Sequence, residues 1–266
     1  MKVSILGNGL TSFALAMSLA NHGIKVDIYS DGKLKIYNKF QTLGISKSNL
    51  DFFNINILDI KTFLWNIKKI EIYREKLGNE KILNFENNND PLFSMIKNID
   101  LYNFLLRNLK KNKLVMFKKE INNKNLLKIG YDLIFNCEYN NFFSKKFFYK
   151  KIKKNYDSCA YITTFNHKKL LSNNVASQVF TKKGPLAFLP ISPKETSVVY
   201  SVKGKTDIDF NESIKKYNMK YEIIKINKFS KFELKSSSLR CYYYKNVIAF
   251  GDMLHKLHPL AGQGFN

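Results

Sequence analysis

The residues best suited to bind a ligand stand near the end of the printed sequence. An apolar run at residues 246–250 predicts a buried strand, and Gly251 and Asp252 follow it. A carboxylate at the C-terminal end of a strand lies at the edge of an α/β sheet where ligands bind. Pro259 stiffens the chain before a Gly-Gln-Gly at 262–264. That tripeptide predicts a helix start whose backbone N–H groups face something electron-rich.

A second candidate site lies in the first 30 residues. The pattern predicts a strand at 2–6, a helix at 13–21 that ends near Gly23, and a strand at 25–29. Between the first strand and the helix, residues 7–12 read Gly-x-Gly-x-x-Ser. In a βαβ unit the first glycine allows the tight turn and the second lets the backbone approach a pyrophosphate. This turn predicts a dinucleotide cofactor.

The acid that binds a cofactor ribose is expected at the end of the second strand. Ser30 stands at that position and Asp31 follows it. Either Asp31 reaches the ribose with a shifted backbone, or the serine hydroxyl takes a weaker part in binding. Loss of a charged acceptor costs roughly 1.5–3 kcal/mol of affinity.

The middle of the chain predicts a change of architecture. Before residue 150 we expect a loop and short helix at 42–53, and a hairpin formed by strands at 67–73 and 81–85. A helix capped by Asp100 should follow, and then two more strands at 114–117 and 131–136. Short apolar runs punctuated by Gly and Pro then predict antiparallel strands at 159–165, 176–180, 186–191 and 197–202. Residues 203–240 are polar and contain one expected helix at 211–217.

The composition bounds the class of protein. The 266 residues are 45% hydrophobic, which is typical of a globular chain, and the formal net charge is +23. The charge has two explanations that the sequence leaves open: attraction to an anionic surface, or a genome biased toward lysine. Three scattered cysteines suit a reducing cytoplasm. The four histidines show no metal-ligand spacing, so no metal site is expected.

Several of these motifs resemble one enzyme family, the flavin-dependent aromatic hydroxylases of the para-hydroxybenzoate hydroxylase type. Within it the chain is most similar to the ubiquinone-biosynthesis hydroxylases. The resemblance rests on Gly-x-Gly-x-x-Ser at 7–12, Gly-Ile-Ser-x-Ser at 44–48, Tyr-Asp-Ser-Cys-Ala at 156–160, Phe-Thr-x-x-Gly-Pro-Leu-Ala-Phe-Leu-Pro at 180–190, and Gly-Asp-x-x-His-x-x-x-Pro-x-x-Gly-Gln-Gly-x-Asn at 251–266.

The resemblance implies an α/β fold: a Rossmann-like FAD-binding domain with an inserted, mostly antiparallel β-sheet substrate domain. The FAD-binding domain is expected at 1–65, 98–150 and 241–266, and the substrate domain at 66–97 and 151–240. FAD is the implied cofactor, and NADH or NADPH the co-substrate. The implied cofactor-binding residues are Gly7, Gly9, Leu10, Thr11, Ser12, Ser30, Asp31, Gly251, Asp252, Pro259, Gly262, Gln263 and Gly264.

Two departures from the family pattern follow from the same comparison. The family's middle motif, Ala-Asp-Gly-x-x-Ser, is replaced at residues 137–142 by Cys-Glu-Tyr-Asn-Asn-Phe. Glu138 keeps a carboxylate, but Tyr139 stands in place of the glycine. The family also continues beyond Gly-Gln-Gly-x-Asn, so the chain is expected to be C-terminally short, either as a fragment or as a reduced form.

The implied function is hydroxylation of the aromatic ring of a polyprenylated phenol in ubiquinone biosynthesis, through NAD(P)H-reduced flavin and a flavin hydroperoxide. A non-catalytic flavoprotein-like subunit or lipid-binding scaffold of the quinone pathway is the alternative, and a flavin reductase is a third. No side chain is assigned a catalytic role, since His255 and His258 are interpreted as structural. Expected partners are the phenol, an anionic membrane surface and quinone-pathway enzymes. Nucleic acid is not expected, and the location is cytoplasmic, with docking at the inner face of the membrane.

Overall fold

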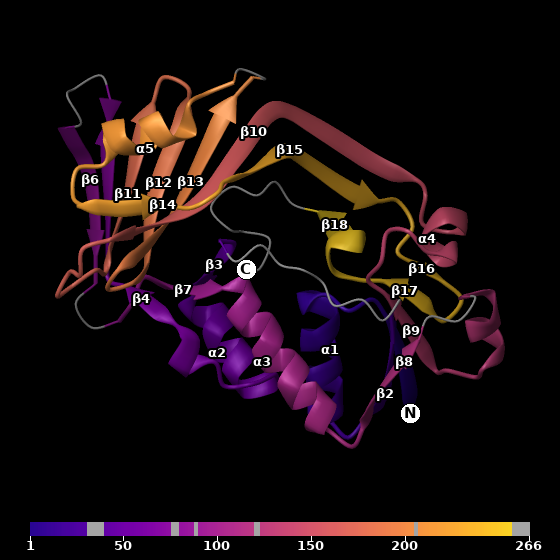
Figure 1. The fold of residues 1–266 in the computed structure, drawn as a ribbon. Coiled ribbons are helices and arrows are strands. Elements are labelled where there is room, and N and C mark those ends of the chain that lie inside the picture. The colour runs from indigo at the N-terminus through magenta and orange to yellow at the C-terminus, as the bar shows by residue number, and fades with distance from the viewer. Residues whose placement is uncertain (31–39, 76–79, 88–89, 120–122, 205–206, 257–266) are drawn as a thin grey trace.

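The chain folds into two regions of sheet that are joined by two long strands (Figure 1). The computed structural model describes residues 1–30, 40–75, 80–87, 90–119, 123–204 and 207–256, and of residues 123–125 only the backbone. Long strands β10 (Lys151–His167) and β15 (Ser230–Leu239) belong to the larger sheet and extend from it toward the parallel sheet.

The first region is a mainly parallel sheet in the order β16-β17-β9-β1-β2-β8. Its strands are β16 (Tyr243–Tyr244), β17 (Val247–Ala249), β9 (Leu133–Asn136), β1 (Lys2–Leu6), β2 (Lys25–Ser30) and β8 (Val115–Lys119). Only β16 runs antiparallel to its neighbour. The βαβ opening predicted from the sequence is present, with β1 and β2 side by side.

Helices α1 (Leu10–Asn21) and α3 (Asn98–Lys111) pack together and cover one face of this sheet. The alternating residues Val3 and Ile5 of β1 point to that face and are fully buried there. On the other face, a second cluster packs Leu6 and Ile134 with α4 (Phe142–Lys146) and the segment after it. Both faces of the parallel sheet are therefore covered, as is usual for such sheets.

The second region is a larger, mostly antiparallel sheet in the order β18-β15-β10-β13-β12-β11-β5-β6, with β14 beside β10. Its remaining strands are β5 (Lys69–Arg74), β6 (Glu80–Glu86), β11 (Val175–Thr181), β12 (Gly184–Ser192), β13 (Glu195–Lys203), β14 (Ile223–Ile226) and β18 (His255–Lys256). Helix α5 (Phe210–Tyr217) packs on one face of this sheet (Figure 1). Together the two regions confirm the predicted α/β class.

A small sheet in the order β3-β7-β4 lies between the two regions (Figure 1). It is formed by β3 (Thr42–Ser46), β7 (Phe93–Lys97) and β4 (Trp65–Ile67), with α2 (Lys47–Asn56) and the short η1 (Lys61–Phe63) following β3 and leading toward β4. Ser46 caps α2 by accepting a hydrogen bond from the Asn49 N–H. The expected loop at the start of 42–53 is wrong, because pairing with β7 makes it a strand.

Three other expectations about elements were wrong. Asp100 does not cap α3, because the helix begins at Asn98 and Asp100 lies in its first turn. Helix α1 begins three residues before the predicted start, at Leu10. The polar segment 203–240 contains β14 and β15 in addition to the predicted helix, because both strands pair with β10. The domain boundaries given above stay a prediction.

Candidate functional site

The glycine turn after β1 has a conformation that favours glycine at Gly7. Gly7 has a φ of +118°, which disfavours other residues, and its N–H donates to the Tyr29 carbonyl at 2.9 Å. A Cβ at this position would lie 3.0 Å from Cγ and Oε1 of Glu138. Conformation therefore favours glycine here, and a Cβ would also crowd the Glu138 side chain.

Helix α1 starts at the end of this turn. Gly9 is its N-cap and makes no side-chain hydrogen bond to the helix, and its first turn contains no acidic residue. The positive end of the helix dipole is thus not neutralised by the chain's own carboxylates in that turn. Such a helix start suits the phosphates of a nucleotide.

The Gly251–Asp252 turn lies directly against the start of α1. Gly251 has a φ of +65°, and a Cβ there would approach Cγ2 of Thr11 to 2.5 Å. The short η4 (Gly251–Met253) begins at Gly251, and the Asp252 side chain is exposed. The first and last ligand-binding motifs of the sequence therefore meet at one place.

Strand pairing explains why they meet. Asn136 at the end of β9 is in register with Leu6 of β1 and Ala249 of β17. The Phe250 N–H also donates to the Asn136 carbonyl at 2.9 Å. Three parallel strands thus end at the same sheet edge, and each is followed by one of the motifs.

A network of buried amides fixes the third segment at this edge, the loop after β9. The Asn141 side chain donates to Oδ1 of Asn136 at 2.6 Å and accepts from the Ser144 N–H at 2.9 Å. The Ser144 hydroxyl donates to the Glu138 carbonyl. The loop that contains Glu138 and Tyr139 is consequently held in one conformation.

Tyr139 connects this loop to the Asp252 turn. Its hydroxyl donates to the Asp252 carbonyl oxygen at 2.5 Å, and the Lys151 Nζ lies 4.9 Å from the centre of its ring. Burial and the nearby Asp252 carboxylate raise the pKa of Tyr139, so its hydroxyl stays protonated and donates. Burial and the neighbouring Lys153 lower the pKa of Lys151.

Part of the chain is similar in sequence to mammalian monooxygenases. Residues of the chain are 27% identical over 160 residues to the mitochondrial ubiquinone biosynthesis monooxygenase of Homo sapiens, and 26% identical over 154 residues to that of Mus musculus. These matches cover 44% and 42% of this chain but 34% and 32% of the relatives, so the chain matches about a third of their length. No protein-family model matches the chain.

Solved structures match over almost the whole chain. Klebsiella pneumoniae HpxO complexed with FAD and uric acid superimposes with a TM-score of 0.74 at 12% identity, over 100% of this chain and 76% of that one. The p-nitrophenol 4-monooxygenase of Pseudomonas putida superimposes with a TM-score of 0.74 at 12% identity, over 98% of this chain and 75% of that one. The chain has the fold of the FAD-dependent aromatic hydroxylases. The resemblance predicted from the sequence is confirmed.

Within this hydroxylase fold, the structure brings together seven of the predicted site residues at one sheet edge: Gly7, Gly9, Leu10, Thr11, Ser12, Gly251 and Asp252. Ser30 ends β2, the next strand along. Asp31, Pro259, Gly262, Gln263 and Gly264 lie outside the described residues. His255 is exposed and pairs with Ser238 through β18, and His258 also lies outside the described residues. Sequence reasoning missed the contact between Tyr139 and Asp252, which depends on the register of β9 and β17.

The residues that are described fit FAD. The start of α1 favours the charge of a pyrophosphate, and Asp252 offers an exposed acceptor for hydroxyl groups. Within the described residues, no three His, Cys, Asp or Glu side chains gather in a way that could hold a metal ion.

The larger sheet has a half-buried apolar row. Ile162, Val199 and Ala187 are in register across β10, β13 and β12. Their neighbours along the strands, such as Tyr161 and Val198, pack under α5. Because side chains alternate along a strand, the row lies on the face opposite α5.

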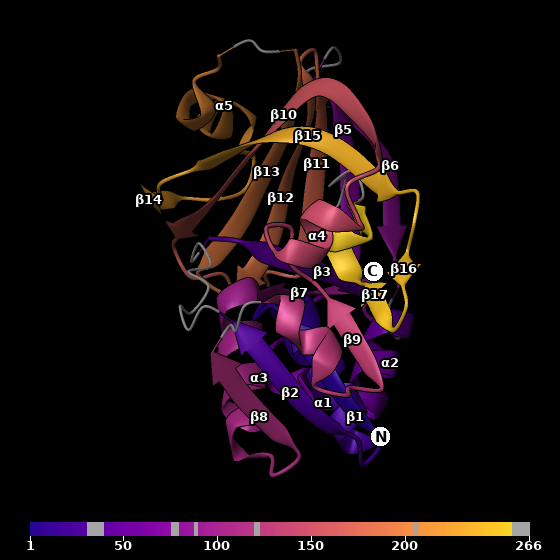
Figure 2. The same cartoon turned by 90° about the vertical axis from the view of Figure 1, so that its right-hand side faces the viewer.

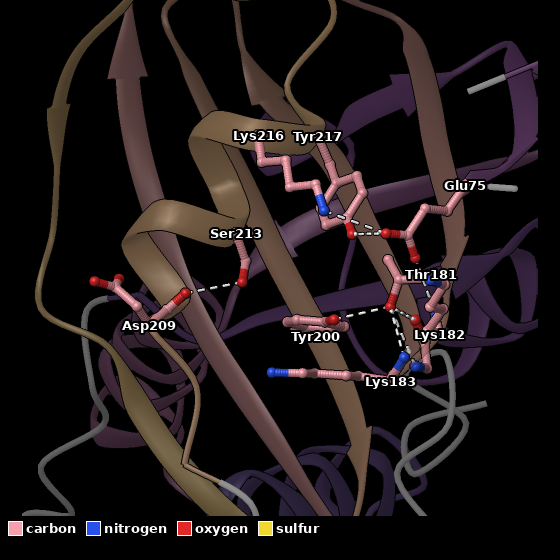
Figure 3. Close-up of polar contacts among 10 residues, drawn as sticks. Glu75, Thr181, Lys182, Lys183, Tyr200, Asp209, Ser213, Lys216 and Tyr217 are labelled. Atoms are coloured by element: carbon pink, nitrogen blue, oxygen red, sulfur yellow. Dashed lines mark hydrogen bonds and ion pairs between the residues drawn. The ribbon is translucent and has the colours of Figure 1, made fainter. Parts of the chain in front are cut away.

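A polar cluster fixes α5 and the β11–β12 turn on the far side of that sheet (Figure 3). The Glu75 carboxylate accepts from the Tyr217 hydroxyl at 2.6 Å, the Lys182 N–H at 2.7 Å and Lys216 Nζ at 3.2 Å. These hydrogen bonds, with that of Tyr217 the largest, lower the pKa of Glu75 to about 2. In the same turn, the Thr181 hydroxyl is 2.8 Å from that of Tyr200. The cluster joins α5, the β11–β12 turn and the end of β5.

Proposed function

We propose that the chain is an FAD-dependent monooxygenase that hydroxylates the aromatic ring of a polyprenylated phenol in ubiquinone biosynthesis. The observation that supports FAD binding most directly is the contact of Gly251 with Thr11, which joins the dinucleotide turn to the Asp252 turn. The names of the mammalian relatives, which are ubiquinone biosynthesis monooxygenases, support the pathway.

Each part of the site has a physical task in this proposal. Bound FAD supplies the oxygen chemistry after reduction by NADH or NADPH. In this proposal, the N–H groups at the start of α1 face the pyrophosphate charge. Asp252 accepts hydrogen bonds from hydroxyl groups of the cofactor, as its place in the family motif implies. Tyr139 fixes the backbone of that turn.

The half-buried row on the larger sheet is the proposed substrate surface. Ile162, Val199 and Ala187 present apolar side chains that suit an aromatic ring and exclude water from it. Exclusion of water protects reactive intermediates from hydrolysis. Replacing Val199 by a larger Leu is expected to raise KM for the phenol about tenfold or more while leaving FAD affinity unchanged, because overpacking costs about 1–3 kcal/mol.

The first experiment is the visible spectrum of the purified chain, before and after addition of FAD. We expect bound flavin, and we expect Asp252→Ala to lower FAD affinity at least about tenfold, because a charged acceptor contributes about 1.5–3 kcal/mol. Asp207→Ala is the matched control, since the Asp207 side chain is 94% exposed and pairs with Lys231 in the other region. A wild-type chain that takes up no flavin would exclude the monooxygenase function.

A non-catalytic flavoprotein-like subunit or lipid-binding scaffold is the second candidate. Tyr139 favours it, because a bulky side chain contacts the Asp252 turn where the family motif has a glycine. The two candidates differ in reductive chemistry. A monooxygenase oxidises NADH or NADPH faster when a phenol is added, whereas a scaffold retains FAD and oxidises neither nucleotide.

A further inference from the structure

A basic and aromatic surface lies at the end of the molecule that carries α4. Two segments form it, residues 142–156 and 235–246, and together they contain nine lysines and arginines and no Asp or Glu. The whole chain has 44 basic and 21 acidic residues, so some acids would be expected in any 27-residue sample. The charge here is therefore more one-sided than the average of the chain.

The two segments lie side by side. Lys153 of β10 is in register with Ser237 of β15, and the Arg240 N–H donates to the Lys150 carbonyl at 3.0 Å. The rings of Phe147 and Tyr244 stack with centroids 3.6 Å apart. Figure 2 shows α4, β16 and the adjoining parts of β10 and β15 on the side that faces the viewer. The charges of both segments thus add on one part of the surface.

Large apolar and aromatic side chains are exposed among these cations. Tyr149 is 61% exposed, Ile152 58%, Tyr242 54% and Tyr243 68%. Among the described residues, Lys235 is the only one of the nine cations with an ion-pair partner, Glu233. Lysines with long apolar stems and tyrosines with a polar tip are the side chains that occupy the boundary between lipid headgroups and acyl chains.

From this combination we propose that the surface, defined as residues 142–156 and 235–246, docks the protein on an anionic lipid bilayer. Basic residues attract the headgroups, and the exposed tyrosines and Ile152 enter the interface. Single-stranded nucleic acid also attracts cations and stacks on aromatic rings. The aliphatic Ile152 favours lipid, because it has no ring on which a base can stack. No helix within the described residues is long and apolar enough to cross a membrane.

The surface is continuous with the proposed flavin site. Lys151, the first residue of β10, is part of this surface and lies over the ring of Tyr139. The Tyr139 hydroxyl in turn contacts the Asp252 turn. Docking would therefore bring the site close to the bilayer in which a polyprenylated phenol resides. This placement rests on the proposed function, but the binding of lipid does not.

The test is co-sedimentation of the full chain with phosphatidylcholine vesicles that contain or lack phosphatidylglycerol. We expect binding only to the anionic vesicles, and weaker binding as salt screens the charges. The variant Lys150→Gln/Lys153→Gln/Lys154→Gln should lower the partition coefficient at least about tenfold. Tyr242→Ser/Tyr243→Ser should also lower it, although the charge is unchanged.

The matched control is Lys110→Gln/Lys111→Gln/Lys113→Gln, three exposed lysines at the end of α3 that remove the same charge. We expect the control to bind nearly as well as the wild type. Equal losses in both triple variants would overturn the proposal, because net charge alone would then explain binding. It would also be overturned if the surface variants lost affinity for a labelled single-stranded RNA while no form bound vesicles. Vesicle binding is compared only among variants whose thermal stability matches that of the wild type. A wild-type chain that failed to bind FAD would not alter these outcomes.

Discussion

Tyr139 is the residue at which this chain departs furthest from the motif that its site otherwise follows. Its hydroxyl contacts the backbone of Asp252, so the side chain acts on the cofactor only through that turn. It is therefore a positioning residue. The raised pKa of Tyr139 keeps its hydrogen bond intact through neutral and mildly alkaline pH.

Tyr139→Phe is predicted to weaken FAD binding about 2- to 10-fold, because one neutral hydrogen bond contributes about 0.5–1.5 kcal/mol. Flavin fluorescence quenching measures the affinity, and the flavin absorption spectrum reports any altered environment. Tyr149→Phe is the control, since Tyr149 is exposed. If Tyr139→Phe lowered thermal stability but left FAD affinity and spectrum unchanged, the residue would be structural only.

Gly251→Ala is predicted to destabilise the fold by about 1–3 kcal/mol in urea denaturation. One part of the cost is overlap of the new Cβ with Cγ2 of Thr11, and the other is the φ of +65°. Thr11→Ser removes the overlapping methyl group, so the double variant should recover part of the loss. Strict additivity of the two substitutions would show that the residues do not interact.

The residue types of the site could be predicted from sequence, but their contacts could not. Gly7 and Asp252 follow from spacing relative to apolar runs, because a strand followed by a glycine turn has few alternatives. The meeting of Gly251 with Thr11 depends on the strand order of the sheet, which brings β17 beside β9. Periodicity along the chain carries no information about that order.

At the scale of elements, a single carboxylate joins α5, the β11–β12 turn and the end of β5 (Figure 3). Its folded-state pKa of about 2 lies below its ordinary value of 4.5. The stabilisation from Glu75 is therefore complete above pH 4.5 and is lost as the pH falls toward 2.

Glu75→Gln is predicted to lower the free energy of unfolding at neutral pH, with a deficit that shrinks as the pH falls below about 4.5. Urea denaturation across this range measures the difference. Glu212→Gln on the exposed side of α5 is the control and should show no comparable change. A deficit that stayed constant with pH would mean that the Glu75 charge does not stabilise the contact.

Elements with regularly spaced apolar residues could be predicted from the sequence, whereas elements made mainly of polar residues could not. The opening β1, α1 and β2 and the core strands β11 to β13 are apolar enough to be recognised. Strand β15 reads as a polar loop, with a run of serines after Lys235. It is a strand because β10 supplies hydrogen-bond partners along most of its length, which is a tertiary effect.

At the scale of the whole molecule, β10 and β15 link the two regions. The two strands pair in two stretches, which a shift in register separates. The stretch that begins at Lys151↔Leu239 lies next to the parallel sheet, and the stretch that begins at Cys159↔Glu233 lies in the body of the larger sheet. Neither region can lose this pair of strands without disturbing the other.

Unfolding is therefore predicted to be a single cooperative transition. Fluorescence of Trp65, whose indole N–H donates to the Asn173 carbonyl at 2.6 Å, reports the larger sheet and its neighbours. Far-ultraviolet circular dichroism reports both regions. Coincident curves in urea are the expected result, whereas separate midpoints would show that the regions unfold independently.

The position of β17 beside β9 has a consequence for synthesis of the chain. Residues 247–249 leave the ribosome more than a hundred residues after β9, yet they complete the parallel sheet beside it. During that interval β9 has an open edge, which is a site for wrong pairing. All strands of the larger sheet except β18 emerge before β17, so most of that sheet can fold while the parallel sheet is incomplete. A pause in translation before residue 247 would prolong the exposure, so the yield of folded protein should depend on the speed at which that last stretch is made.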